Sequence, residues 1–250
     1  MLFPEDTLLL KFSALATALV TAASLHGDVI TQITSPGGLA SNDSVNWSQL
    51  GADQTTIPNT FSAVSVLGNA ISGSFATSTG QVATVCPVGT GTCSWNTSGT
   101  GINAGDTAIW TINPSANPSN DGPLTLAFGT GVLGGGAWLQ ANETDIFAVF
   151  TAQLNVYNNA TLLATYTVNS DSNGDPVFLG ALDSTGANVT SMIFSVTAVP
   201  ADANVNDFAL DTLLLTSPVS SSTPEPASFG LLTAGLAGLA WKLRRRTSSK

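Results

Sequence analysis

Short β-prone runs, separated by turn residues every few positions, set the strongest limit on how this chain can fold. A dozen runs are enriched in Val, Thr, Ile and Phe, and period-two alternation is clearest at residues 162–168 and 193–197. The runs cover residues 28–34, 45–50, 61–67, 71–76, 81–85, 107–112, 124–128, 146–157, 162–168, 177–182, 191–198 and 207–215. No long 3.6-residue pattern lies between the two terminal segments. The sequence therefore predicts an all-β fold, a two-sheet β-sandwich that is jelly-roll-like.

Three turn signals lie between these runs. Asn158-Asn159 separates two runs and predicts a hairpin, because Asn tolerates a positive φ. The segment at residues 171–176 is a cluster of Asp, Ser, Asn, Gly and Pro that is typical of a turn. Three consecutive glycines at residues 134–136 predict a bend, a bulge or a close backbone approach.

The basic residues have an unusual distribution. All six lie near the ends of the sequence, at Lys11, Lys242, Arg244, Arg245, Arg246 and Lys250, and the net charge is −10. Residues 24–241 therefore contain no Lys or Arg, so no Lys or Arg salt bridge can form there. Without cations the domain cannot neutralise phosphates, which excludes nucleic-acid binding. Anionic membranes and acidic polysaccharides should be repelled, whereas neutral sugars and Ca²⁺ remain compatible.

The segment at residues 224–246 combines three features in a fixed order. Pro224, Glu225 and Pro226 are followed by fifteen uncharged residues at 227–241, and then by Lys242 and the cluster at 244–246. As a helix the uncharged run would be about 22 Å long, short for a hydrocarbon core of about 30 Å. Flanking residues can compensate by snorkelling, and the arginine cluster should stay cytoplasmic. The run thus predicts a short transmembrane helix, which either remains as an anchor or is later removed.

This tail resembles the PEP-CTERM sorting signal found in Gram-negative bacteria that make exopolysaccharide. Pro224, Glu225 and Pro226 match its box, and Arg244, Arg245 and Arg246 match its basic end, whereas Thr223 stands where the family often has an apolar residue. The resemblance implies recognition by an exosortase, a membrane protein, with cleavage near the box and transfer to the cell surface or its matrix. Related tails are also labelled as the C-terminal region of ice-binding proteins, a label that describes the tail alone.

An export signal at the other end should accompany such a tail. Lys11 precedes a twelve-residue apolar run at residues 12–23, with small residues at 21–24. This pattern predicts a cleaved signal peptide, although Glu5 and Asp6 reduce the positive charge before it. An ordinary N-terminal helix is the alternative. The expected organisation is a signal peptide at 1–23, a β-sandwich domain at 24–216, a linker at 217–223 and the sorting signal at 224–250.

The two cysteines, Cys86 and Cys93, close a Gly-rich loop. In an exported protein such a pair predicts a disulfide, worth roughly 2–3 kcal/mol in the chain-entropy model. A metal pair is the alternative, but the nearby sequence lacks the further ligands of a tetrahedral site.

Catalytic patterns are weak in this sequence. The single histidine, His26, lies at the predicted cleavage point, which argues against a Ser-His-Asp or Cys-His mechanism. Glu143 and Asp145 would share a strand face as a glycosidase pair requires, but a polar loop that enters the strand at residue 146 is the favoured explanation.

Two groups of residues predict a calcium site. Asp171, Asn173 and Asp175 have a spacing that directs three oxygens into one loop, although the later EF-hand positions do not match. The alternative is an Asx-rich turn. Asp207 and Asp211 would share one face of a final strand, and the alternative there is solvation of an edge strand.

Among the tryptophans, Trp95 and Trp47 are the predicted platforms for stacking on sugar rings, with burial in the core as the alternative. Taken together, the sequence predicts a non-enzymatic, exported cell-surface or matrix protein associated with exopolysaccharide. The alternatives are a carbohydrate-binding module for neutral glycans and a secreted hydrolase.

Overall fold

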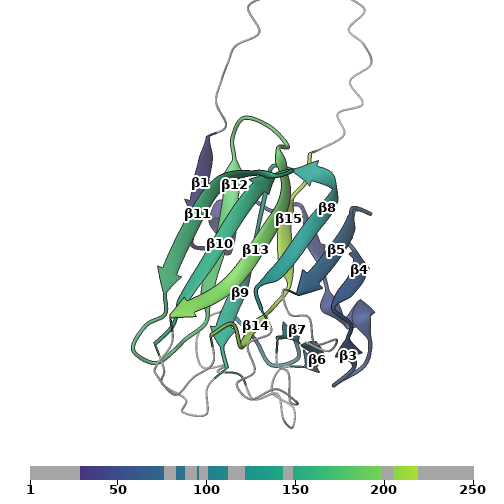
Figure 1. Ribbon diagram of the computed structural model, residues 1–250, viewed down its shortest axis with the longest axis vertical. Coiled ribbons are helices and arrows are strands. Elements are labelled where there is room, and N and C mark those ends of the chain that lie inside the picture. The colour runs from purple at the N-terminus through teal and green to yellow at the C-terminus, as the bar shows by residue number, and fades with distance from the viewer. Residues whose placement is uncertain are drawn as a thin grey trace, which may run out of the picture. The chain divides into compact units, whose positions relative to one another are not determined.

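The fold is built from antiparallel strands in two sheets (Figure 1). A computed structural model describes residues 29–75, 95, 101–111, 122–142, 149–198 and 205–218, together with the backbone of residues 83–87. Within these residues the only helical elements are the four-residue turns α2 (Pro36–Leu39) and η1 (Trp47–Leu50). The prediction of an all-β sandwich is confirmed, while the jelly-roll-like connection stays a prediction.

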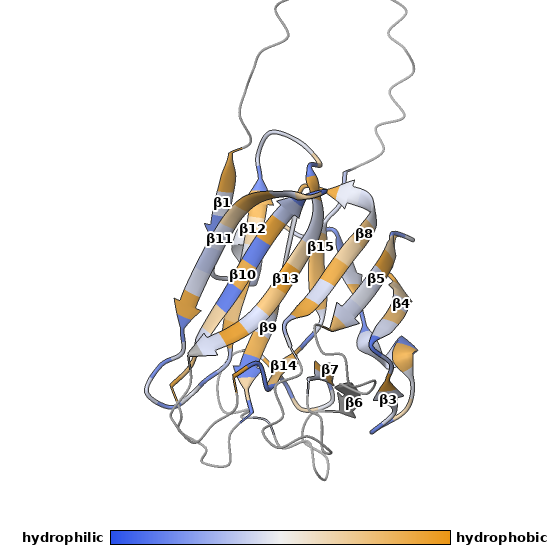
Figure 2. Cartoon of the chain, in the orientation of Figure 1, coloured by the Kyte–Doolittle hydropathy of each residue, from blue (hydrophilic) through white to orange (hydrophobic). Residues whose placement is uncertain are grey.

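The six-stranded sheet, called sheet B here, has the order β11-β10-β13-β8-β5-β4. Its strands are β4 (Thr60–Val64), β5 (Ala70–Phe75), β8 (Leu124–Val132), β10 (Thr151–Asn158), β11 (Thr161–Asn169) and β13 (Val189–Ala198). Burial alternates along β4 and along most of β5 and β10, so one face is covered and the other faces solvent. Figure 2 shows the same alternation in hydropathy along β10.

The nine-stranded sheet, called sheet A, has the order β1-β12-β9-β14-β7-β6-β3, with β15 and β2 on a branch from β9. Its strands are β1 (Ile30–Ile33), β2 (Asp43–Val45), β3 (Thr56–Ile57), β6 (Ala83–Pro87), β7 (Thr107–Trp110), β9 (Gly134–Ala141), β12 (Val177–Asp183), β14 (Phe208–Leu210) and β15 (Leu213–Thr216). Strand β9 pairs with β12 along one side and with β15 and then β14 along the other. It is therefore the strand on which sheet A branches.

The glycine run at the start of β9 allows a close backbone approach, as its sequence predicted. Gly136 pairs with Gly180 of β12, and a Cβ on Gly136 would lie 2.7 Å from the Cα of Gly180. Any larger residue at either position would push the two strands apart. The run is otherwise regular strand, and no bend interrupts it.

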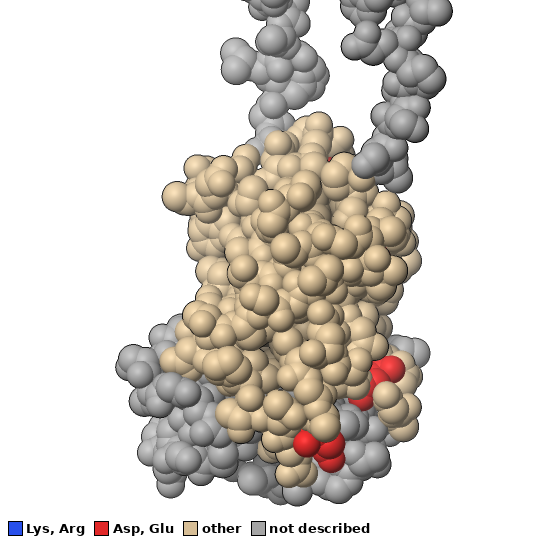
Figure 3. Space-filling model, turned by 90° about the vertical axis from the view of Figure 1, so that its right-hand side faces the viewer, with Lys and Arg blue, Asp and Glu red and all other residues tan. Residues whose placement is uncertain are grey.

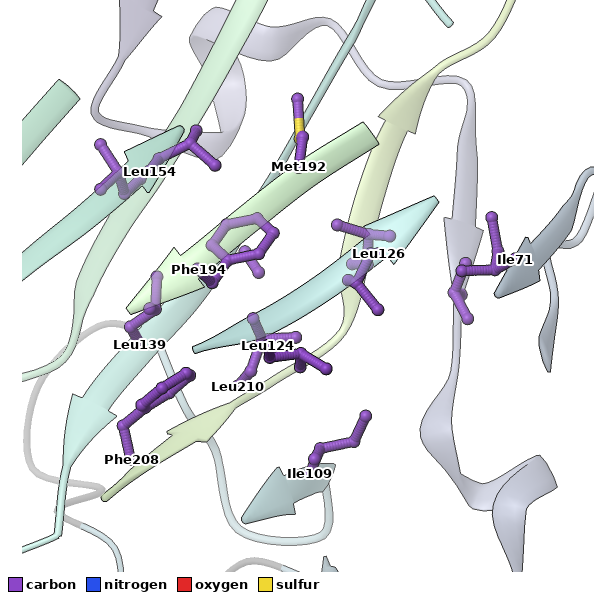
Figure 4. Packing of buried hydrophobic residues seen from close by; sticks show 14 of the residues in the cluster. Ile71, Ile109, Leu124, Leu126, Leu139, Leu154, Met192, Phe194, Phe208 and Leu210 are labelled. Atoms are coloured by element: carbon purple, nitrogen blue, oxygen red, sulfur yellow. The ribbon is translucent and has the colours of Figure 1, made fainter. Parts of the chain in front are cut away.

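One hydrophobic core lies between the sheets and draws residues from both of them. Figure 4 shows side chains of β8, β10 and β13 directed toward those of β7, β9 and β14. Leu126, Phe194 and Leu154 on sheet B, and Leu139 and Leu210 on sheet A, are completely buried. This shared core is the largest source of stability that the described residues offer.

Most predicted strands and the hairpin are confirmed, with small shifts of the strand ends. Asn159 has a φ of 51° in the two-residue loop between β10 and β11, as expected of a hairpin Asn. Two predicted strands are wrong in part. Residues 47–50 form the helical turn η1 instead of continuing β2, and the run at 207–215 divides into β14 and β15 at Asp211 and Thr212.

The predicted terminal helices lie outside the described residues. Within the part of the chain that is described, no helix is long and apolar enough to cross a membrane.

Replacing Gly136 with Ala should destabilise the domain by about 1–3 kcal/mol, because the added methyl group meets the backbone of β12 and the strands must shift. Denaturant unfolding of the purified chain measures the change. Gly37→Ala is the matched control, since a Cβ there meets no atom within 4 Å, and its stability should be equal or slightly higher. Equal stability of the two variants would contradict the close approach.

Candidate functional site

Trp47, one of the two predicted sugar platforms, is a core residue. Its side chain is completely buried, its ring packs edge-on against Phe61 with centroids 6.3 Å apart, and its Nε1–H donates to the carbonyl of Asp211 over 2.9 Å. A buried ring presents no face to a ligand, so the prediction of a platform at Trp47 is wrong. The indole instead binds the backbone at the break between β14 and β15.

Trp95, the other predicted platform, is only 8% exposed. Its ring packs edge-on against Trp110 with centroids 5.6 Å apart, in a small cluster with Ile102, Ala108 and Ala209. This packing explains the position of Trp95 without a ligand. Of the neighbouring pair, Cys93 lies outside the described residues and only the backbone of Cys86 is described, so the disulfide stays a prediction.

Asp207 lies directly before β14 and is 3% exposed. Its carboxylate accepts a hydrogen bond from Trp110 Nε1 over 2.8 Å and another from Asn142 Nδ2 over 3.0 Å. The carboxylate thus joins β7 and the end of β9 to β14. This is a structural role, and it differs from solvation of an edge strand because β14 lies between β7 and β9.

Asp211, the predicted partner of Asp207, lies directly after β14 and is 4% exposed. The pKa of Asp211 is raised to about 6, chiefly by burial and also by the negative charge of Asp106, while hydrogen bonds from Thr212 act in the opposite direction. Asp211 is therefore a carboxyl group whose charge is poorly compensated by its surroundings.

The other predicted set of calcium ligands, Asp171, Asn173 and Asp175, forms an Asx turn. Hydrogen bonds from the backbone N–H groups of Asp175 and Asn173 to Asp171 Oδ1, 3.0 and 2.9 Å long, lower the pKa of Asp171. In the described part of the chain, no three His, Cys, Asp or Glu side chains gather in a way that could hold a metal ion. Calcium binding by these residues or by Asp207 and Asp211 stays a prediction without support from the geometry.

Two buried carboxylates, those of Asp43 and Asp183, are not among the residues that the sequence analysis singled out. Asp43 at the start of β2 is 5% exposed, and Asp183 at the end of β12 is completely buried. Oδ1 of Asp183 accepts from the N–H and Oγ1 of Thr185, and its Oδ2 accepts from Asn188 Nδ2 over 2.9 Å. These donors follow within five residues, so a local Asx-type pattern was the signal available in the sequence.

Asp43 binds parts of the chain that are far apart in the sequence. Oδ2 accepts from Ser65 Oγ over 2.6 Å and from Ser217 Oγ over 3.1 Å, and Oδ1 accepts from the N–H groups of Ser44 and Leu67. Burial alone would raise the pKa of Asp43, but these hydrogen bonds outweigh it and hold the pKa below its usual value near 3.8. Asp43 therefore ties the β4–β5 turn to the residue that follows β15.

The described residues thus present a set of buried carboxylates that hold strand ends together. A comparison with family models finds a match outside them: residues 222–246 match the PEP-CTERM protein-sorting motif. The chain carries a PEP-CTERM sorting motif. No curated protein and no solved structure matched the chain in the corresponding searches.

The PEP-CTERM motif contains every sorting residue that the sequence predicted. Pro224, Glu225 and Pro226 lie at its start, and the arginine cluster 244–246 lies at its end. The motif supports an exported protein that an exosortase, a membrane protein, sorts through a membrane-anchored intermediate to the surface of a Gram-negative cell. His26 and the pair Glu143 and Asp145, like the motif itself, lie outside the described residues.

Replacing Asp211 with Asn should make the protein more stable at pH 7. Because its folded pKa is raised, folded Asp211 holds its proton more tightly than unfolded Asp211, and stability falls as the pH rises from about 4 to about 6. The rise of this pKa from 3.8 to about 6 corresponds to roughly 3 kcal/mol, which the neutral amide would recover. Denaturant unfolding between pH 4 and 7 measures it, with the exposed Asp53→Asn as control. A variant with the same pH dependence as the unmodified protein would contradict this account.

Replacing Asp43 with Asn should have the opposite effect and destabilise the protein by about 1–3 kcal/mol at pH 7. Four donors point at the carboxylate, and an amide group would oppose some of them with a donor of its own. Since the folded pKa is lowered, the stabilisation exists above the usual value near 3.8 and disappears as the pH falls through the folded value. Unfolding curves at pH 7 and between pH 5 and 2 measure this, and an unchanged stability at pH 7 would contradict it.

Proposed function

We propose that this protein is a non-enzymatic component of the cell surface or extracellular matrix that associates with exopolysaccharide. The observation that carries the proposal is the PEP-CTERM motif at residues 222–246, since it assigns the protein to a sorting route toward the surface. The β-sandwich that precedes the motif is then the part delivered. Its lack of Lys and Arg fits this role, because positive charge is confined to the segments that direct topology.

A non-enzymatic role is supported by how the described carboxylates are used. Asp43, Asp183 and Asp207 are buried and accept hydrogen bonds from neighbouring groups, so none is presented as a nucleophile or general base. Asp211 has a raised pKa, but it too is almost completely buried, at the break between β14 and β15.

Binding of neutral glycans is the second candidate, and the uncharged surface of sheet B favours it. None of the six strands of sheet B contains an Asp, Glu, Lys, Arg or His. Such a surface has no means of attracting a charged polymer, whereas neutral polymers meet no electrostatic cost of desolvating charged groups.

Replacement of Pro224, Glu225 and Pro226 with Ala should stop delivery at the membrane. The variant should accumulate there as a full-length form, because the residues that match the sorting box are gone while the apolar run and arginine cluster remain. Fractionation and immunoblotting of the native host would measure the membrane, surface and matrix pools. Ser220→Ala with Ser221→Ala, just before the matched residues, is the control and should be delivered normally. Normal delivery of the box variant, or retention of the unmodified protein in the cytosol, would overturn the proposal.

A further inference from the structure

The outer face of sheet B carries regular rows of small polar residues near its β4 edge. The strand register places Thr60 of β4 opposite Ser74 of β5, and Ser74 opposite Thr125 of β8. The next row places Ser62 opposite Ser72. Neighbouring strands lie about 4.8 Å apart and alternate residues on one strand about 6.7 Å apart, so these five hydroxyl groups form a compact array.

An open hollow of about 300 Å³ lies over this array. Five of the eight residues that line it carry hydroxyl groups: Thr60, Ser62, Ser72, Ser74 and Thr125. The volume is at the lower end of the range for ligand clefts. The hollow thus combines a concave shape with a lining that is rich in hydroxyl groups and contains no charged side chain.

The hydroxyl groups of the hollow have no partner within the described residues. Polar side chains elsewhere on the same sheet bind one another, for example Thr165 Oγ1 to Asn155 Oδ1 over 2.9 Å and Thr151 Oγ1 to Asn169 Oδ1 over 2.7 Å. The two halves of the face therefore differ. Hydrogen-bonding capacity is satisfied internally near β11 and is left for water or a ligand near β4.

No charged side chain lines the hollow either. Figure 3 shows that the acidic side chains on view gather mainly in two groups near the lower end, with no basic side chain among the described atoms. The polar groups that a ligand in the hollow would contact are thus hydroxyl groups, each of which can donate one hydrogen bond and accept two. A sugar ring of a neutral polysaccharide presents the same kind of group, while phosphates, sulfates and carboxylates would need a cation that the domain lacks.

From this array we infer that the hollow over β4, β5 and β8 binds a chain of neutral polysaccharide. The inference rests on the proposed association with exopolysaccharide and gives it a site and a class of ligand. The site differs from the aromatic platforms expected from the sequence, since Trp47 and Trp95 are buried elsewhere.

Affinity electrophoresis of the full-length chain would test this inference. The chain would be kept in a polyoxyethylene detergent, which carries no sugar, and run in gels containing hydroxyethylcellulose, pullulan or galactomannan. Polygalacturonate, an anionic polymer, is the comparison. At least one neutral polymer should retard the protein, and polygalacturonate should not.

Ser72→Ala combined with Ser74→Ala should weaken that retardation roughly tenfold, as loss of two hydrogen bonds to a ligand predicts. Ser41→Ala combined with Ser172→Ala is the matched control, because both serines are exposed and lie outside sheet B; its retardation should be unchanged. A thermal melt shows that each variant is folded. Should the first pair fail to fold, Ser62→Ala with Thr125→Val removes two other hydroxyl groups of the hollow and should weaken binding similarly.

Three results would overturn the inference: no retardation by any of the neutral polymers, equal retardation of the hollow and control variants, or equal retardation by polygalacturonate. Self-association of the chain that the hollow variants abolish would instead identify a second copy as the occupant and would also overturn it. Failure here is distinct from failure of the proposed function. If the protein reaches the surface in the fractionation experiment but binds none of the neutral polymers, the proposed delivery to the surface stands and the proposed binding site is wrong.

Discussion

The hydrogen bonding of buried carboxylates without any basic residue is the constraint on which much of this structure depends. Ion pairing with Lys or Arg is impossible between residues 24 and 241, yet four described aspartates are almost completely buried: Asp43, Asp183, Asp207 and Asp211. Burial of an ionised carboxylate is costly unless donors surround it. Hydroxyl, amide, indole and backbone N–H groups supply those donors at the first three sites. Asp211 has less of this compensation, and the consequence is a raised pKa.

The carboxylates also explain where the sheets are joined. Asp43 links β2 with the β4–β5 turn of sheet B and with Ser217 beyond β15, while Asp207 links three neighbouring strands of sheet A. At the break after β14, the indole of Trp47 binds the carbonyl of Asp211 and holds the point where the chain passes to β15. These contacts lie at strand ends, where backbone groups would otherwise lack ladder partners.

Local pattern was sufficient to predict most strands and the hairpin at Asn159, because alternation and turn chemistry are properties of neighbouring residues. It failed where distant residues decide the outcome. The run at 207–215 reads as one strand, but it pairs with two separate stretches of β9 and breaks between them. The site at Asp43 was missed for the same reason, since Ser217 lies 174 positions from it. The prediction that Trp47 lies at the surface is wrong because the residues next to it in the sequence do not reveal that its indole N–H binds the carbonyl of Asp211.

The division between the two sheets follows from the same shortage of positive charge. The buried aspartates occur in and around sheet A, and the strands of sheet B contain no Asp, Glu, Lys, Arg or His. A sheet without charge keeps its outer face hydrated through hydroxyl and amide groups alone. Near β11 hydroxyl groups donate to the side-chain amide oxygens of Asn155 and Asn169, whereas strands β4, β5 and β8 contain no Asn or Gln. The hydroxyl groups near β4 therefore lack amide partners because of the composition of these strands, and they collect where the face is hollow.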